Sequence, residues 1–539
     1  MINSFKSVLS PVFSTNGHLP DWCGSLNAVA FDESGWQAHL RSIDQPCYVV
    51  SDGARLGITH QRSMPSGERL ALLAAVGPLN QSQLGSAQFR AAYGLKYAYA
   101  AGAMANGISS AELVIALGQA GLLASFGAAG LTANRIEAAL QRIQTALPNG
   151  PYAFNLIHSP SEEALERNAV ELYLKQGVRT IEASAFLALT THIVHYRAAG
   201  LSLNRQGEIE IGNKVIAKVS RREVATHFLS PAPSSLLQPL VAQGLISEAQ
   251  AQMAQQVPMC DALTVEADSG GHTDNRPLNC LLPSLLELRD ELRTRYGYSQ
   301  VVYIGAAGGI GTPASALGAF TMGADYIVTG SVNQACVESG ASAHTKQILS
   351  QAGQADVMMA PAADMFEMGV KVQVLKKGTL FPVRAQKLYE LYKACDSLET
   401  IPTAEREKLE KQIFRKPLDT VWQETEVFFR ERDPEQLERA HQNPKRKMAL
   451  VFRWYLGLSS RWSNSGEAGR ELDYQIWCGP AMGAFNEWTQ GTALATPENR
   501  HAVDVAEHLM LGAAYLYRLQ HLRIQGVSLP ASLSTYKPE

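Results

Sequence analysis

Apolar runs of strand length alternate with amphipathic segments of helix length over the middle of the chain. There are eight such runs, at residues 95–104, 121–128, 152–157, 178–184, 214–220, 261–267, 301–307 and 325–331. The first helical segment starts at Ser109 or Ser110 with Glu112 close behind, as a helix N-cap region does. Alternating strands and helices predict a parallel sheet with right-handed crossovers. Eight units in about 235 residues indicate an α/β fold of the TIM (β/α)8 barrel type, and a doubly wound open sheet remains the alternative.

The pattern changes on both sides of this repeat. We expect residues 1–80 to form a small N-terminal lead-in with short strands, and residues 81–345 to form the barrel. The connection at about 221–260 is too long for a simple turn, which predicts a helical insertion of two short helices after strand 5. This insertion is either a packed excursion or a wall over the C-terminal face of the barrel. Residues 346–395 are expected to connect or cap the barrel, and 396–539 to form a mostly helical C-terminal domain.

Composition narrows the class of protein. Of the 539 residues, 46% are hydrophobic and 18% are charged, which predicts a sizeable core and argues against disorder. A net charge of −3 gives no nucleic-acid signature. The seven cysteines include no C-x-x-C pair, which favours a reducing compartment and no structural metal site. No signal peptide and no membrane span are expected, so the predicted setting is cytoplasmic.

Two glycine-rich turns follow the last two predicted strands. Gly308, Gly309 and Gly311 follow the seventh strand, and Gly330 and Ser331 follow the eighth. Glycine turns present backbone N–H groups without an obstructing Cβ, and barrels commonly bind phosphate at these two turns. Tight strand-to-helix turns need glycine in any case, so each turn alone is weak evidence. No Lys-Ser/Thr follows, as in a Walker loop, and the G-x-G-x-x-G spacing of a Rossmann fold is missing.

A histidine follows two glycines directly after the sixth predicted strand, in the run EADSGGH. His272 can pass a proton to or from a reacting carbon, and Gly270 and Gly271 let the backbone approach a planar ring. Asp268 is expected to orient His272 or to bind a ribityl hydroxyl, and a solvated loop carboxylate is the alternative. A histidine that merely caps a loop is also possible, but its place at the end of a barrel strand favours catalysis.

Other strand ends carry further candidates. The turn after the first strand, with Ala103 and Met104, offers backbone groups to the edge of a flavin ring, although Met104 would also suit a core. Asn155, at the third strand, has the donor and acceptor that flavin atoms need. Glu182 and Lys218 end the fourth and fifth strands. They either contact the cofactor or form an ion pair inside the barrel mouth.

These segments resemble a known superfamily. AGAMANGISSAELVIALGQAG, FNLI, EADSGGH and YIGAAGGIGTPASALGAFTMGADYIVTGS, followed by Glu338-Ser339, are similar to the nitronate monooxygenase and flavin-dependent enoyl reductase superfamily over roughly residues 95–345. Later segments, MAPAADMFEMGVKVQVLKKGTLFP, KMALVFRWYLGLSSRW and LDYQIWCGPAMGAFNEW, closely resemble the PfaD family. The superfamily usually has Glu-Ala-Gly-Gly-His, whereas Asp268-Ser269 stands here in place of Glu-Ala.

PfaD proteins are stand-alone enoyl reductases of polyunsaturated fatty acid and polyketide synthases. The resemblance implies an FMN-binding enoyl reductase that takes electrons from NADPH or NADH and reduces trans-2-enoyl thioesters on acyl carrier protein domains. Nitronate oxidation and a non-catalytic flavin-binding subunit remain the alternatives. The acyl chain length, the choice of NADPH or NADH, and the oligomeric state stay open, with a homodimer as one option.

The resemblance also assigns residues. His272 would be the catalytic histidine. Gly308, Gly309, Gly330 and Ser331 would hold the FMN phosphate, and the Met104 backbone and Asn155 would touch the flavin ring. Further candidates for FMN contact, from their places at strand ends, are Ala103, Glu182, Lys218, Asp268, Gly270 and Gly271. An acidic carrier protein predicts a basic docking face. The candidates are Arg415-Lys416, Lys445-Arg446-Lys447 and Lys376-Lys377, each with an ordinary solvated charge cluster as the alternative.

Overall fold

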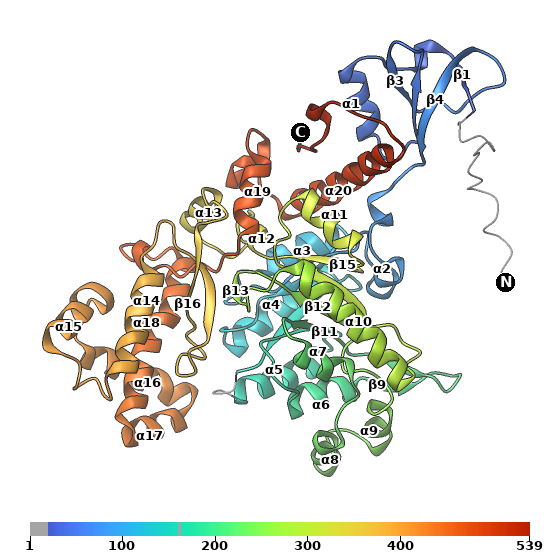
Figure 1. The fold of residues 1–539 in the computed structure, drawn as a ribbon. Coiled ribbons are helices and arrows are strands. Elements are labelled where there is room, and N and C mark those ends of the chain that lie inside the picture. Colours follow the sequence, from blue (N-terminus) through green and yellow to red (C-terminus); the bar gives the residue numbers. More distant parts are fainter. Residues whose placement is uncertain (1–19, 160–162) are drawn as a thin grey trace. The chain divides into compact units, whose positions relative to one another are not determined.

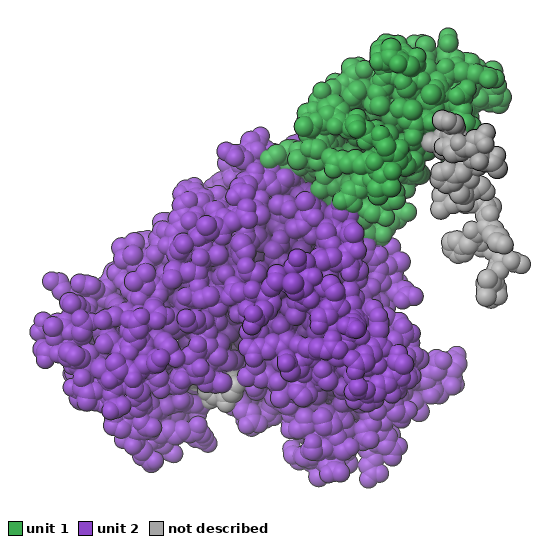
Figure 2. Space-filling view, viewed as in Figure 1, with its two compact units in different colours: residues 1–84, 507–538 green, residues 85–506, 539 purple. Residues whose placement is uncertain are grey.

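The computed structural model describes residues 20–159 and 163–539. The chain divides into two compact units (Figure 2). Of the described residues, the first unit holds 20–84 and 507–538, and the second holds 85–159, 163–506 and 539. None of the described helices is both long enough and apolar enough to cross a membrane.

A closed barrel of eight parallel strands forms the centre of the second unit (Figure 1). Around the ring the strands are β11 (Lys214–Val219), β12 (Ala262–Glu266), β14 (Tyr303–Ala307), β15 (Tyr326–Thr329), β5 (Tyr99–Ala101), β6 (Leu123–Phe126), β7 (Ala153–Ile157) and β8 (Thr180–Ser184). Each strand lies within one of the eight predicted runs, so the predicted (β/α)8 barrel is confirmed and the open sheet is not formed. Because all eight strands are parallel, their carboxyl ends share one rim.

The barrel is surrounded by helices, most of which connect one barrel strand to the next (Figure 1). These are α2 (Ala87–Tyr93), α3 (Ala111–Gln119), α4 (Ala133–Ala146), α5 (Glu163–Lys175), α6 (Thr191–Ala199), α7 (Arg222–Leu229), α10 (Leu278–Tyr296), α11 (Pro313–Thr321) and the short α12 (Ser331–Gln334). Ser110 caps α3, since its side chain accepts a hydrogen bond from the Leu113 backbone N–H. The predicted helix start is therefore confirmed.

The long connection after the fifth barrel strand holds three helices. The first, α7, is the barrel's own crossover helix, and α8 (Ser234–Ala242) and α9 (Glu248–Ala254) are the insertion. Both inserted helices pack against α6, and α9 also packs against β9 (Leu201–Leu203), which pairs with β10 (Ile209–Ile211). The insertion is therefore a packed excursion on the outside of the barrel, the first of its two expected forms.

After the barrel, the chain builds a small sheet and a helical region. β16 (Val357–Pro361) and β17 (Lys371–Leu375) form a hairpin, and β17 also pairs with β13 (Gly271–His272). The helices are α13 (Ala343–Ser350), α14 (Phe381–Ala394), α15 (Thr403–Lys408), a π-helical turn (Leu409–Phe414), α16 (Leu418–Arg432), α17 (Pro434–Gln442), α18 (Pro444–Ser465) and α19 (Ala481–Thr489). A core shared by α14, the π-helical turn, α16 and α18 includes the buried rings of Phe366, Phe381, Phe414, Phe452 and Tyr455.

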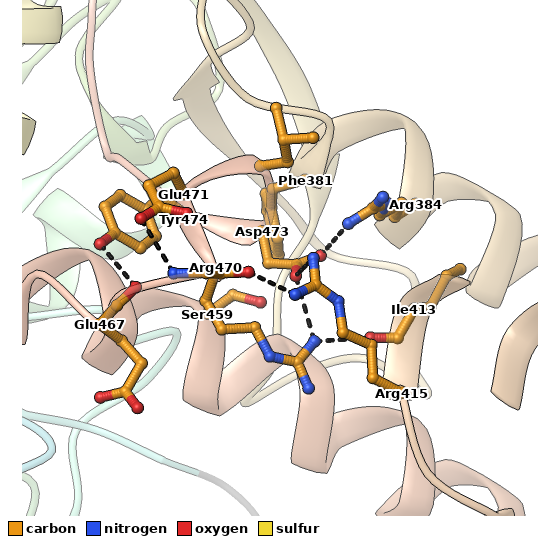
Figure 3. Close-up of polar contacts among 12 residues, drawn as sticks. Phe381, Arg384, Ile413, Arg415, Ser459, Glu467, Arg470, Glu471, Asp473 and Tyr474 are labelled. Atoms are coloured by element: carbon orange, nitrogen blue, oxygen red, sulfur yellow. Dashed lines mark hydrogen bonds and ion pairs between the residues drawn. The ribbon is translucent and has the colours of Figure 1, made fainter. Parts of the chain in front are cut away.

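A buried carboxylate fixes the end of this helical region (Figure 3). Asp473 is fully buried, and the Tyr455 hydroxyl donates to its Oδ1 over 2.8 Å. Arg384 also pairs with Oδ1, while Arg470 and Arg415 lie 3.1 and 3.2 Å from Oδ2. Arg470 in addition donates to the backbone carbonyls at the end of the π-helical turn. One carboxylate thus joins four separate parts of the helical region.

The first unit is an antiparallel sheet with two helices. The strands, in spatial order, are β1 (Trp22–Gly24), β4 (Glu68–Val76), β2 (Cys47–Ser51) and β3 (Leu56–Thr59), and the helices are α1 (Glu33–Arg41) and most of α20 (Ala502–Ile524). The Arg518 guanidinium of α20 donates to five backbone carbonyls within residues 39–45. This division differs from the expected one, because residues 507–538 pack with the lead-in and not with the helical region.

The buried Asp473 site generates a stability prediction. Asp473→Ala should lower the free energy of unfolding by about 3–5 kcal/mol, because three guanidinium groups lose their shared carboxylate. Urea unfolding followed by tryptophan fluorescence measures the change. The matched control is Asp419→Ala, which removes a carboxylate that is 81% exposed and should cost about 1 kcal/mol or less. Equal losses in the two variants would contradict the prediction.

Candidate active site

The carboxyl rim of the barrel carries a chain of charges between neighbouring strands. Lys218 Nζ lies 3.1 Å from Glu266 Oε1 and 3.6 Å from Glu182 Oε1. The Ser125 hydroxyl donates to Glu182 Oε2 over 2.6 Å. Burial acts to lower the pKa of Lys218, but the two carboxylates outweigh it and raise that pKa, so the lysine stays protonated. The ion pair expected between Glu182 and Lys218 is present, and Glu266 joins it.

The predicted flavin contacts at the ends of β5 and β7 are already engaged with the protein. The Ala103 backbone N–H donates to Glu182 over 3.1 Å, and the Met104 N–H donates to the Ser109 hydroxyl over 3.0 Å. The Asn155 amide donates to the Glu182 carbonyl over 3.1 Å and to Ser184 Oγ over 2.8 Å. The backbone N–H groups expected to be exposed after the first strand therefore have internal acceptors.

The glycines after β14 and β15 divide into packed and open positions. Gly308 and Gly309 have φ angles of +85° and +75°, which favour glycine. A Cβ built on Gly308 would lie 2.6 Å from the Ala267 carbonyl carbon, so this glycine allows two backbones to touch. A Cβ on Gly309 or Gly330 would meet no other described atom within 4 Å. Two turns on adjacent strands therefore face open space, which suits a phosphate group.

A distant segment of the chain covers this side of the rim. Ser331 accepts a hydrogen bond from the Gly479 backbone N–H over 3.0 Å. A Cβ on Gly270 would lie 2.8 Å from the Cys478 nitrogen, and one on Gly311 would lie 2.3 Å from the Ala481 carbonyl oxygen. Sequence reasoning did not place residues 477–481 at the site. The only local signal is the tight Cys-Gly-Pro run of that segment.

His272 meets a carboxylate from the hairpin and not the one expected. His272 Nε2 lies 3.2 Å from Asp364 Oδ1. Asp268 instead accepts hydrogen bonds from the amides of Asn275 and Gln373, over 2.8 and 2.7 Å. The expectation that Asp268 orients His272 is therefore wrong. The pairing of β13 with β17 is the physical reason, because it brings His272 to the hairpin that carries Asp364.

The environment of His272 favours its protonated form. Burial acts to lower the pKa of His272, but the Asp364 carboxylate outweighs burial and leaves this pKa above its ordinary value. Burial acts to raise the pKa of Asp364, but His272 outweighs it and the net pKa is lowered. A histidine whose pKa is raised by a neighbouring carboxylate is better suited to act as a general acid.

The cations proposed as a docking face are mostly paired within the second unit. Their partners are Asp473 for Arg415, Glu424 for Lys416, Asp356 for Lys377, the Tyr392 and Cys395 carbonyls for Lys445, Glu367 for Arg446 and Glu399 for Lys447. Lys445 and Arg446 thus stabilise contacts between helices and the hairpin. These pairings agree with ordinary charge clusters, the alternative given for each candidate, and the docking face stays a prediction.

Known families match most of the chain. The family described as "Nitronate monooxygenase" matches residues 91–390. The family described as "Fatty acid synthase subunit PfaD N-terminal domain" matches residues 22–78. A third, "[Acyl-carrier-protein] S-malonyltransferase, inserted helical domain", matches residues 395–474.

Individual relatives are similar over most of this chain. A polyunsaturated fatty acid synthase component of a Thraustochytrium species is 49% identical over 90% of this chain and 32% of its own length. The polyketide biosynthesis protein PksE of Bacillus subtilis is 43% identical over 84% of this chain and 58% of its own. The chain thus spans less than two thirds of these relatives. A crystal structure of the enoyl reductase domain of MlnA, from the macrolactin cluster of Bacillus amyloliquefaciens, is 42% identical with a TM-score of 0.78, over 83% of this chain and 100% of that one.

The charge chain in the barrel generates a prediction. Lys218→Met should lower the free energy of unfolding by about 3–5 kcal/mol, because Glu182 and Glu266 would keep their charges in a buried site without the cation between them. Thermal unfolding followed by circular dichroism measures the loss. Lys377→Met removes a lysine that is 47% exposed and should change stability by about 1 kcal/mol at most. A Lys218→Met protein as stable as this control would refute the structural role of the pair.

Proposed function

The chain belongs to the PfaD family of nitronate monooxygenase-like barrels, and we propose that it is a flavin-dependent enoyl reductase. One observation carries the proposal: a histidine paired with a carboxylate and two open glycine turns share one rim of the barrel. The similarity to the MlnA enoyl reductase domain over that domain's whole length supports the same reaction. The histidine supplies an acid, and the glycine turns supply a place for a phosphorylated cofactor.

The glycine turns fit flavin mononucleotide. Gly309 and Gly330 leave the space that a Cβ would fill, so their backbones can approach the phosphate of the cofactor. Gly308 holds the first turn in place against the backbone after β12. When bound, the flavin would accept a hydride from NADPH or NADH and pass it to the β-carbon of the substrate. Ala103, Met104, Asn155, Glu182, Lys218 and Asp268 remain proposed neighbours of the cofactor.

The reaction that we propose saturates one carbon–carbon double bond of a trans-2-enoyl thioester. A hydride is added at the β-carbon and a proton at the α-carbon, while NADPH or NADH is oxidised. His272 would donate the proton. Burial acts to lower the pKa of His272, but the Asp364 carboxylate outweighs burial and the net pKa is raised. As pH rises through this pKa, the acid is lost and the reaction should slow.

The substrate would arrive as a thioester on an acyl carrier protein domain. The relatives that support this are named as parts of polyunsaturated fatty acid and polyketide synthases. Turnover of a carrier-bound crotonyl group more efficient than that of crotonyl-pantetheine would support this partner.

Cofactor binding can be tested at one glycine. Gly330→Ala should weaken FMN binding at least about tenfold, which is about 1.4 kcal/mol, because the new methyl group enters the open turn. A Cβ at this position meets no described atom within 4 Å, so the variant should still fold. The measurement is quenching of FMN fluorescence during titration with flavin-free protein. The control is Gly318→Ala in α11, where a Cβ also meets no described atom within 4 Å and where FMN affinity should stay unchanged.

The reaction can be tested at His272. His272→Ala should keep bound FMN and lose enoyl reduction, because the proton donor is removed. The visible spectrum is followed during anaerobic NADPH addition and then after addition of a crotonyl thioester. Bleaching of the flavin bands and their recovery define the wild-type reaction, and the variant should bleach without recovery. His441→Ala, at an imidazole that is 58% exposed, is the control and should behave as wild type.

Three results would overturn parts of this proposal. Full enoyl reduction by His272→Ala would remove this residue from the mechanism. Turnover of a nitronate with oxygen, without enoyl reduction, would favour the monooxygenase reaction of the wider family. A yellow protein that oxidises no NADPH in the presence of enoyl thioesters would favour a non-catalytic flavin-binding role.

A further inference from the structure

His272 and Asp364 come from different parts of the second unit. His272 lies on β13, which follows the sixth barrel strand, and Asp364 lies in the turn of the hairpin formed by β16 and β17. We call residues 357–375 the cap hairpin. Its strand β17 pairs with β13, so that His272 lies opposite Val372. The contact between the imidazole and the carboxylate therefore crosses the join between the barrel and the cap hairpin.

The turn that carries Asp364 is anchored on both sides. At its base, the Ala362 N–H donates to the Val370 carbonyl over 2.9 Å. Beyond Asp364, Phe366 is fully buried in the helical core. Glu367 pairs with Arg446 of α18 over 2.7 Å. Within the turn, the Met365 backbone N–H also donates to Asp364 Oδ1 over 3.1 Å, which holds the carboxylate in place.

The charged groups around the pair favour one protonation state. The groups that act on His272 are Asp364 of the cap hairpin, Glu266 at the end of β12 and Lys218 of β11. Arg453 of α18 acts on Asp364 and helps to keep it ionised. Both carboxylates raise the pKa of His272, whereas burial and Lys218 lower it. Asp364 is the only one of these groups that touches the ring, among the residues that the structure describes.

The contact also gives the two ring nitrogens of His272 different surroundings. Nε2 faces Asp364, and Nδ1 has no hydrogen-bond partner among the described residues. A ring that gives up its Nδ1 proton keeps the Nε2 proton, which can donate to Asp364. The carboxylate thus supports the charged ring before proton transfer and one tautomer of the neutral ring afterwards.

From this geometry we propose that Asp364 is the positioning residue of the site, holding His272 at Nε2 so that Nδ1 delivers the proton to the substrate. The identity of the substrate in this proposal rests on the proposed enoyl reductase function. The pairing of His272 with Asp364 does not depend on that function. The active site is accordingly completed by the cap hairpin, and the barrel without it would carry a histidine with no carboxylate partner.

The test compares Asp364→Asn with Asp268→Asn in the full chain. Asn keeps the shape of each side chain and removes its charge. Proton–carbon NMR of ¹³C-labelled histidine follows the ring signal of His272, assigned by its loss in His272→Gln. In the wild type the pKa should lie above the ordinary 6.5. Asp364→Asn should lower it by about one unit or more. Asp268→Asn should leave it nearly unchanged, because Asp268 bonds to Asn275 and Gln373.

Two further measurements separate positioning from a merely structural role. The ¹⁵N chemical shifts of the wild-type His272 ring at pH 9.5 should show the neutral tautomer with its proton on Nε2. This measurement uses the wild-type protein alone, so it does not depend on the folding of a variant. As pH rises, the rate of crotonyl-thioester reduction should begin to fall at a lower pH in Asp364→Asn than in the wild type. The FMN affinity of the variant should be unchanged. Asp364→Ala replaces Asp364→Asn if the latter does not fold.

The outcomes distinguish the two proposals. An unshifted His272 pKa in Asp364→Asn, an equal shift in Asp268→Asn, or a neutral ring protonated on Nδ1 would overturn the role of Asp364. A shifted pKa together with no enoyl reduction by the wild type would leave the pair intact and overturn the proposed function instead. Enoyl reduction with the same pH profile in wild type and Asp364→Asn would refute the positioning role alone.

Discussion

The pairing of β13 with β17 is the contact on which the candidate site depends. Only two residues of β13 take part, opposite Val372 and Gln373. The side chain of Gln373 strengthens the join, because its amide donates to Asp268 Oδ1 over 2.7 Å and to the Ser269 carbonyl over 2.8 Å. On the same strand, Val374 bridges to Trp477, which leads into the segment over the glycine turns. One short sheet therefore brings together the histidine, its carboxylate and the cover of the glycine turns.

Two buried charge clusters hold the surroundings of this join in place. In the barrel, one lysine lies between two carboxylates, and in the helical region one carboxylate lies among three arginines. Buried ion pairs contribute little net stability compared with apolar packing, but they are costly to break. Asp473 lies four residues before Trp477, where the segment beside the glycine turns begins, so its arginines hold the chain close to the start of that segment. The clusters therefore fix geometry more than they add stability.

Glycine performs two different tasks at the rim. At Gly270, Gly308 and Gly311 a Cβ would come within 3 Å of another backbone, so glycine allows chain segments to pack closely. At Gly309 and Gly330 the same substitution would meet open space. The sequence shows these glycines as similar turn residues. Only their neighbours in space tell a packing position from a position that can face a ligand.

The sequence alone determined the local features of this protein. The eight strands, the N-cap of α3 and the place of His272 after the sixth strand follow from hydrophobic periodicity and turn chemistry, which act over a few residues. The tertiary structure decided the partners. It brought Asp364 and not Asp268 to His272, placed 477–481 over the glycine turns, and joined 507–538 to the lead-in. These contacts link segments about 90 to 500 residues apart, and local patterns carry no information about which distant surface completes them.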